Sequence, residues 1–327
     1  MNQRKKIEFE RLISTNYKNI AGIIVQKNGK LLYENYFNKY TASNPVHIAS
    51  VTKSIFSALI GIALEKKHIK SLDQKVLNFF PDYKILEGEK AIQNITIRHM
   101  LTMTAPYKYK KEPYEKFFES DNWIEAALDL LGGKEPTEKF TYSAIIGTHI
   151  LSGILVKATG QSVFDFAKEN LFTPLEISVK QNIRLVSKEE HMSFFKDKNI
   201  SGWATDPQGI NSAAWGLTLT PIDMAKIGQL YLDKGLWNGK KILPKWWVDK
   251  STIEHSRWGK LSYGYLWWII DNNKHIYAAI GDGGNVIYIN EKEKLVISIA
   301  SLPSEKAKDR IKLIREYMEP LFEFQIF

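Results

Sequence analysis

A regular run of apolar positions near residue 55 predicts the best-defined helix of the chain. Ile55, Leu59, Ile62 and Ala63 recur at the spacing i, i+4, i+7 and i+8, which forms the apolar stripe of a helix buried on one face. We therefore predict a helix over about residues 50–66. Because its first three turns are nearly all apolar, we expect its start to lie inside the protein.

The two ends of the chain combine strand-like patterns with one helix each. Residues 5–19 read as a helix, and Asn28-Gly29 predicts a tight hairpin between two strands. Four short β-rich runs separated by turns precede a final amphipathic helix. This spacing predicts antiparallel strands rather than β-α-β units. The predicted strands are 22–26, 31–37, 263–270, 276–280, 286–289 and 295–300, and the final helix spans about 304–322.

The centre of the chain follows a helical pattern. Helices are predicted over residues 121–131 and 142–159, with a short helix entry at 94–101. Thr220 and Pro221 supply an N-cap and a proline at the first helical position, which predicts another helix start.

These elements predict an α+β fold, with an antiparallel sheet flanked by the terminal helices and an inserted, mainly helical lobe. We assign residues 1–66 and 255–327 to the sheet lobe and residues 67–254 to the helical lobe. The active site is expected in the cleft between the two lobes.

Composition narrows the chemistry. The 327 residues include 45 basic and 36 acidic ones, for a formal net charge of +9, but no basic stripe is interleaved with aromatic residues. We therefore expect no nucleic-acid partner. The chain has no cysteine, which excludes disulfides and thiolate chemistry, and its seven histidines are scattered, so no metal site is indicated.

The sequence contains no signal for a membrane. Its start, Met-Asn-Gln-Arg-Lys-Lys, is not followed by the apolar stretch of a signal peptide, and no run of about 18 apolar residues occurs. If Met1 is the natural start, we expect a cytoplasmic protein with no membrane partner. The sequence carries no signal for an oligomeric state.

Ser50 and Lys53 stand at the start of the predicted apolar helix. Residues three apart share a helix face, so hydroxyl and amine can meet as nucleophile and base, a known variant of the serine-hydrolase triad. Spacing alone is weak evidence, because Ser193-Phe194-Phe195-Lys196 repeats it before a polar segment, and we interpret that copy as coincidence. Burial would lower the pKa of Lys53 and favour its neutral amine, while the Ser50 N–H would face a developing oxyanion.

Two further segments carry candidate residues. Tyr142 is predicted to open a helix, where it could shuttle protons as a phenolate favoured by a nearby lysine; taken alone, it is more often a packed aromatic. Residues 281–285 (Gly-Asp-Gly-Gly-Asn) could bring the Asn285 N–H to the nucleophile as a second oxyanion donor; taken alone, they read as a hairpin turn. The chain has neither a G-x-S-x-G elbow nor a P-loop.

In this order, the Ser-x-x-Lys pair, the tyrosine and the glycine-rich segment resemble the serine β-lactamase and penicillin-binding-protein superfamily. The resemblance is to its class C-like branch, which also contains esterases, D-amino-acid peptidases and oligomer amidases. Residues 48–54 with 59–61, residues 95–102 and residues 215–225 are similar to further blocks of that family. The resemblance implies a two-lobed fold with no metal and no cofactor. It also implies that Ser50 is the acylated nucleophile, Lys53 its base and Tyr142 a proton-transfer partner, and that the N–H groups of Ser50 and Asn285 form the oxyanion hole.

Two positions depart from the family pattern. Ala144 stands where an asparagine often grips the substrate amide, and Asp282 stands where the third motif usually begins with lysine or histidine. An acid at residue 282 would repel the carboxylate of a penicillin-like substrate. Gly283-Gly284-Asn285 resembles the variant of esterase and oligomer-amidase members. The expected substrate-binding residues are Asp282, Gly283, Gly284 and Trp215.

The leading hypothesis is a serine hydrolase that acts through an acyl-Ser50 intermediate. Its substrate would be a small, neutral or cationic ester, amide or short peptide-like molecule. One alternative is a β-lactamase or D-alanyl carboxypeptidase; another is a catalytically silent relative that binds peptides or cell-wall fragments. Candidates to line the cleft are Trp203, Trp215, Trp258, Tyr107 and Tyr109.

Overall fold

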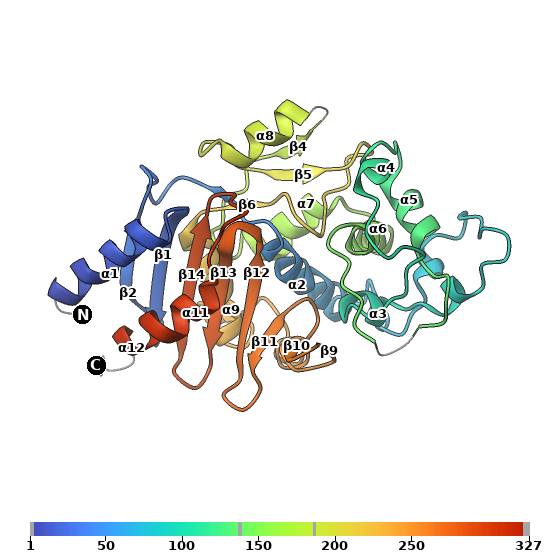
Figure 1. The fold of residues 1–327 in the computed structure, drawn as a ribbon. Helices are drawn as coiled ribbons and strands as arrows, with labels where there is room; N and C mark the ends of the chain where they lie inside the picture. Colours follow the sequence, from blue (N-terminus) through green and yellow to red (C-terminus); the bar gives the residue numbers. More distant parts are fainter. Residues whose placement is uncertain (1–2, 137–138, 186–187, 323–327) are drawn as a thin grey trace.

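A large antiparallel sheet lies at the centre of the computed structural model, which describes residues 3–136, 139–185 and 188–322 (Figure 1). Its eight strands lie in the order β2-β1-β14-β13-β12-β11-β10-β9. The N-terminal hairpin therefore pairs with the last strand of the chain. The strands are β1 (Ile20–Lys27), β2 (Lys30–Tyr36), β9 (Ser256–Trp258), β10 (Leu261–Tyr263), β11 (Trp268–Asp271), β12 (Ile276–Gly281), β13 (Asn285–Asn290) and β14 (Leu295–Ser301).

Helices cover both faces of this sheet (Figure 1). On one face, α1 (Gln3–Asn16) and the C-terminal helical segment share an apolar cluster with the strands. On the other face, α9 (Pro221–Leu232) packs against β1, β13 and β14, and α2 (Val51–Glu65) packs against β12 and β13. The C-terminal segment consists of α11 (Arg310–Leu313), η5 (Ile314–Met318) and α12 (Glu319–Phe322).

The alternation of side chains along β13 explains this three-layer arrangement. Val286 and Tyr288 belong to the cluster beneath α1 and the C-terminal helices. Ile287 and Ile289 point to the opposite face and join the cluster that contains α2 and α9. Because both faces are covered, all six residues of β13 are buried.

A group of helices, which corresponds to much of the predicted helical lobe, adjoins the sheet on the side of α2 (Figure 1). The described residues also form three small two-stranded sheets. The helices are η1 (Val76–Phe79), η2 (Ala91–Asn94), α3 (Ile97–Leu101), α4 (Tyr114–Phe118), α5 (Trp123–Leu130), α6 (Ile146–Thr159), α7 (Val163–Ala167), η3 (Lys168–Phe172), α8 (Lys188–Lys196) and α10 (Lys245–Ser251). The small sheets pair β3 (Val46–His47) with β6 (Thr218–Leu219), β4 (Asn182–Arg184) with β5 (Trp203–Thr205), and β7 (Leu236–Trp237) with β8 (Lys240–Lys241).

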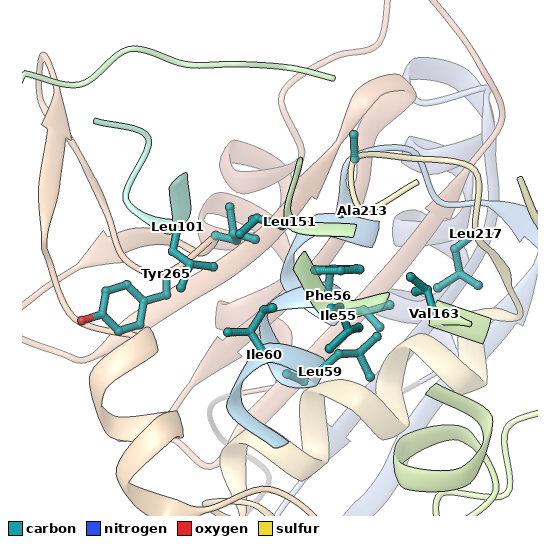
Figure 2. Close-up of a cluster of buried hydrophobic side chains, with 14 of the residues drawn as sticks. Ile55, Phe56, Leu59, Ile60, Leu101, Leu151, Val163, Ala213, Leu217 and Tyr265 are labelled. Atoms are coloured by element: carbon teal, nitrogen blue, oxygen red, sulfur yellow. The ribbon is translucent and has the colours of Figure 1, made fainter. Parts of the chain in front are cut away.

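The helix α2 is more deeply buried than its sequence pattern predicts. Figure 2 shows its apolar side chains among residues from several other elements, including Leu101 of α3, Leu151 of α6 and Val163 of α7. Every residue from Val51 to Ala63 is buried, so the prediction of a single buried face is wrong. The reason is that α2 lies between the sheet and the helical lobe, and both pack against it.

The antiparallel sheet, the α+β class and the N-terminal hairpin are confirmed. The helix start at Thr220 is also confirmed, because the Thr220 hydroxyl accepts a hydrogen bond from the Asp223 N–H at 3.1 Å. The final helix begins at Arg310 and not near residue 304, because the Asp309 carboxylate accepts from the N–H groups of Ile311 and Lys312.

One predicted strand is interrupted. Residues 263–270 do not form a single strand: β10 ends at Tyr263, and β11 starts at Trp268. Between them the Gly264 N–H donates to the Trp267 carbonyl at 2.8 Å, and Leu266 has a positive φ of 61°. A turn therefore replaces the middle of the predicted strand.

The division into two lobes stays a prediction. α9 packs on the sheet, although the predicted boundary at residue 254 assigns it to the helical lobe. Residues 1–2 and 323–327 of the predicted sheet lobe lie outside the described residues.

Candidate active site

The start of α2 brings Ser50 and Lys53 together. The Lys53 Nζ lies 2.9 Å from the Ser50 Oγ and 3.2 Å from the carbonyl oxygen of Ala214, in hydrogen-bonding geometry with both. Lys53 is 2% exposed, whereas Ser50 is half-buried. The pair is therefore arranged as a reachable hydroxyl beside a buried amine.

Burial changes the protonation of this amine. Removal from water lowers the pKa of Lys53 to about 7, although the negative charges of Glu112 and Asp282 act in the opposite direction. Near neutral pH a large fraction of the amine is uncharged and able to accept a proton.

The backbone before the nucleophile is strained. Ala49 has φ of +49°, a left-handed conformation that costs a residue with a β-carbon about 1 kcal/mol or more. Ser50 follows in a helical conformation and occupies the N-cap position of α2. Among the described residues, the Ser50 N–H has no hydrogen-bond partner, so it is free to face a developing negative charge.

The end of β12 packs directly on this turn. A β-carbon added to Gly281 would lie 2.5 Å from the Ile48 carbonyl oxygen and 3.0 Å from the backbone nitrogens of Ser50 and Val51. Only glycine allows so close an approach of strand and helix start. The residue of the glycine-rich segment that lies against the nucleophile turn is therefore Gly281, which the sequence reasoning did not single out.

The side chain of Asn285 has a structural role. Its amide donates to the carbonyls of Asp282 at 2.9 Å and His47 at 3.3 Å, and its oxygen accepts from the Ser301 N–H at 2.9 Å. These bonds connect the 282–284 turn to β3 and β14. The oxyanion role predicted for the Asn285 N–H remains a prediction.

Tyr142 lies beside the pair. The Lys53 Nζ is 5.6 Å from the centre of the Tyr142 ring, which is 38% exposed. Desolvation raises the pKa of Tyr142 to about 12; the Ser50 hydroxyl acts to lower it, whereas the charges of Asp282 and Glu112 add to the rise. Tyr142 is therefore a phenol near neutral pH, and the expectation of a phenolate is wrong.

The expected position of Tyr142 on a helix is also wrong. α6 begins at Ile146, and residues 141–143 precede it without regular structure. The carboxylate of Glu112 accepts from the N–H groups of Ile145 at 3.2 Å and Ile146 at 3.2 Å. A carboxylate from a distant segment thus satisfies the free N–H groups at the start of α6. The helix therefore begins at Ile146 and does not extend back to Tyr142.

Glu112 is a residue of the site that the sequence reasoning missed. It is 8% exposed, and besides these backbone groups it accepts from the hydroxyls of Ser143 and Tyr109. It thereby fixes the turn that carries Tyr142. No signal near residue 112 indicates this role, because Ser143 and the N–H groups of Ile145 and Ile146 lie more than 30 residues further along the chain.

Three of the four predicted substrate-binding residues border one cavity next to the turn before Ser50, and Trp215 does not. Asp282, Gly283 and Gly284 border a cavity of about 570 Å³ that also reaches Ala49. Asp282 is exposed, and its charge influences both Lys53 and Tyr142. The Asp282 carboxylate thus borders a cavity that Lys308 and Arg310 also line. Ala144 is half-buried and carries no polar group for a substrate amide.

The aromatic candidates separate into different environments. Trp203 is fully buried and belongs to the core, and Tyr107 and Tyr109 stack on each other with ring centres 5.1 Å apart. Trp215, which is 8% exposed, directly follows Ala214, the carbonyl partner of Lys53. Trp258 is 61% exposed.

Within the described ranges, no three His, Asp or Glu side chains gather as a set of metal ligands. None of the helices described has the length and apolar character that a membrane-spanning segment requires.

A family model described as Beta-lactamase matches residues 9–319. The chain belongs to the β-lactamase family. The resemblance noted from the Ser-x-x-Lys pair, the tyrosine and the glycine-rich segment is thereby confirmed.

Individual relatives in this family are distant. The chain is 19% identical over 304 residues to the 6-aminohexanoate-dimer hydrolase of Paenarthrobacter ureafaciens, covering 86% of this chain and 72% of the relative. It is 28% identical over 191 residues to penicillin-binding protein 4* of Bacillus subtilis, covering 53% of this chain but 40% of the relative. A D-stereospecific amidohydrolase from Streptomyces sp. has a similar solved structure, with a TM-score of 0.69, 14% identity and coverage of 97% and 98% of the two chains. At that identity the likeness supports the fold alone.

Proposed function

We propose that this β-lactamase-family protein is a hydrolase that transfers an acyl group to water through an acyl-Ser50 intermediate. The observation that carries the proposal is the buried Lys53 amine, 2.9 Å from the Ser50 Oγ and with a pKa of about 7. A neutral amine in hydrogen-bonding contact with a hydroxyl is the arrangement that activates a serine nucleophile.

In the first half-reaction, Lys53 takes the Ser50 proton as the Oγ forms a bond to the substrate carbonyl carbon. The Ser50 N–H stabilises the resulting oxyanion. The second donor is the Asn285 N–H or, since Gly281 lies against Ser50, the N–H of the next peptide, on Asp282. The bond to the leaving group then breaks, and the leaving atom receives the phenolic proton of Tyr142. The Lys53 ammonium then gives a proton to the Tyr142 oxygen, which restores the phenol and the neutral amine.

In the second half-reaction, a water molecule gives a proton to the neutral Lys53 amine and attacks the acyl carbon. The bond between the acyl carbon and the Ser50 Oγ breaks, and the Oγ takes the proton that the Lys53 ammonium gives up. The carboxylic acid product and the starting protonation state of the site result, so no further reactant is required.

The charge of the site supports an ester or amide without a carboxylate near the reacting carbon. The family resemblance puts Asp282 where a cation would hold such a carboxylate, and the Asp282 charge acts to raise the pKa of Lys53. Hydrolysis of an amide between aminohexanoate units, which the name of one relative describes, is compatible with this charge. We therefore favour an esterase or amidase over a β-lactamase or D-alanyl carboxypeptidase.

A fluorophosphonate probe and a panel of short-chain nitrophenyl esters test the proposal. We expect one adduct, on Ser50, in intact-protein and peptide mass spectra, and ester hydrolysis that is lost in Ser50→Ala but kept in Ser193→Ala. No adduct under conditions that label a control hydrolase would refute the mechanism. Equal rates in wild type and Ser50→Ala would leave a binding protein, and rapid hydrolysis of a chromogenic cephalosporin would favour the β-lactamase alternative.

A further inference from the structure

Four aromatic rings form a continuous surface that starts at Tyr142, and we call Phe140, Tyr142, Trp258 and Trp268 the aromatic shelf. The rings of Tyr142 and Phe140 are nearly parallel, at 17° and with centres 6.2 Å apart, and those of Phe140 and Trp258 follow at 13° and 6.3 Å. Trp268 lies within 6.2 Å of each of the other three ring centres.

One side of the shelf packs against a buried tyrosine, and the other side is open to solvent. Tyr263, which is 1% exposed, packs edge-on against Trp268 at 4.7 Å and against Phe140 at 5.4 Å. In contrast, Trp258 is 61% and Tyr142 is 38% exposed. Trp258 ends β9, the outermost strand of the large sheet, so the shelf runs from the nucleophile to the edge of that sheet. Large aromatic surface left in water at a site entrance is a feature of ligand-binding surfaces.

The position of Tyr142 decides which part of a substrate would meet this shelf. Under the proposed mechanism, on which this inference rests, the Tyr142 phenol gives its proton to the leaving atom. Groups attached to the leaving atom therefore lie next to the Tyr142 ring. The acyl group is bonded instead to Ser50, on the side of the oxyanion donors.

We propose that the aromatic shelf is the binding site for an aromatic leaving group, the alcohol or amine part of the ester or amide. Offset stacking on nearly parallel rings recognises a flat aryl group without hydrogen bonds. Tyr142 thus has two roles, as proton donor and as the inner end of the shelf, and Trp258 is its outer, specificity-determining end.

The test keeps the acyl group constant and varies the leaving group. For wild type we expect kcat/KM for benzyl acetate to exceed that for ethyl acetate by roughly three- to tenfold. Trp258→Ala is expected to abolish this preference, because it should lower kcat/KM for benzyl acetate several-fold more than kcat/KM for ethyl acetate. Trp246→Ala is the matched control, because Trp246 is 46% exposed on α10 and does not belong to the shelf. Thermal melting checks that both variants fold.

An unchanged benzyl-to-ethyl ratio in Trp258→Ala, or an equal loss with both esters, would overturn the proposal. A second readout does not depend on catalysis: saturation-transfer NMR with benzyl alcohol. The ring-proton signal should persist in Ser50→Ala and Trp246→Ala and disappear in Trp258→Ala; persistence in Trp258→Ala would refute the shelf as the site. If Ser50 takes no fluorophosphonate and no ester is cleaved, the proposed function fails, and the NMR result alone decides on the shelf.

Discussion

Residues 50–53 and 193–196 both read Ser-x-x-Lys, and both lie at the end of a helix, yet their environments differ. In the first pair, Lys53 is buried and its amine lies 2.9 Å from the Ser50 Oγ. In the second pair, on α8, Ser193 and Lys196 are both exposed, while the intervening Phe194 is buried. The spacing i, i+3 puts serine and lysine on one face in both cases, but that face points inward on α2 and outward on α8.

The difference shows that burial, and not spacing, makes the candidate nucleophile. α2 lies between the sheet and the helical lobe, so the Lys53 amine loses its water, and the pKa of Lys53 falls to about 7. Gly281 adds a backbone contact from β12 at Ser50 and Val51.

Replacement of each serine by alanine should give the largest difference in hydrolysis rate between the two Ser-x-x-Lys pairs. Ser50→Ala is expected to lower ester hydrolysis by about 10³-fold or more, because no acyl-enzyme can form. Ser193→Ala should keep the wild-type rate and the adduct on Ser50. Steady-state kinetics and mass spectrometry provide the measurement, and a comparable loss in Ser193→Ala would contradict the comparison.

Replacement of the lysines tests the buried base. Lys53→Met should lower kcat/KM by about 10³-fold, whereas Lys196→Met should not change it. In wild type, kcat/KM should rise with pH through about 7, as the pKa of Lys53 requires for a base that acts when neutral. A pH profile in which kcat/KM does not rise through about pH 7 would argue against Lys53 as the base.

The same variant has a stability signature. Between about pH 7 and pH 10 the unfolded chain keeps a proton on Lys53 that the folded chain has released, so wild-type stability rises with pH in this window. Any stability advantage of Lys53→Met over wild type should therefore shrink from pH 7 to pH 10 in denaturant melts. A constant difference would mean that the pKa of Lys53 is not lowered.

A side chain at residue 281 should disturb the backbone at the nucleophile. In Gly281→Ala the new β-carbon would press on the backbone of Ile48 and Ser50, and we expect a loss of about 10²-fold in kcat, the size of one lost oxyanion donor. Gly239→Ala is the control, since Gly239 also lies in a turn but has open space around it. Equal activity of the two variants would show that the close approach of β12 is unimportant.

Removal of the Tyr142 hydroxyl should lower kcat as much as Gly281→Ala does, or less. Tyr142→Phe keeps the aromatic shelf but loses the proton donor, and kcat is expected to fall by about 10- to 100-fold. The loss should be greatest for amides and for esters of basic alcohols, which need a proton on leaving, and smallest for nitrophenyl esters. Tyr317→Phe, at a residue 43% exposed on the C-terminal segment, serves as the control. The same loss with every leaving group would exclude Tyr142 as the donor.

The smallest expected effect is a shift in the pKa of Lys53 when the nearby charge of Glu112 is removed. The Glu112 carboxylate raises the pKa of Lys53 against the effect of burial, so Glu112→Gln should move the acid limb of kcat/KM to lower pH, by on the order of one unit or less. Glu115→Gln, a change at an exposed neighbour, should leave the limb in place. A shift to higher pH would contradict this account.

Local patterns predicted much of the fold because neighbouring residues determine them. The apolar period of α2, the Asn28-Gly29 hairpin and the cap at Thr220 are properties of a few adjacent residues. The errors occur where distant groups intervene. The Glu112 carboxylate binds the N–H groups at the start of α6, so this helix begins after Tyr142. In the turn after Tyr263, the N–H groups of Tyr265 and Leu266 donate to the distant carbonyls of Ser251 and Leu101.

The sequence by itself determined the α+β class, the helix behind Ser50 and the side-by-side position of Ser50 and Lys53, because backbone periodicity sets each of these. The apolar helix behind Ser50 also indicated which of the two Ser-x-x-Lys pairs is buried, but only the tertiary structure decided that the Ala214 carbonyl is the second partner of the Lys53 amine. It also decided that Gly281 touches the Ser50 turn and that Glu112 holds the turn of Tyr142. The physical reason is that desolvation and contacts between residues far apart in the chain arise from packing, which no local pattern specifies.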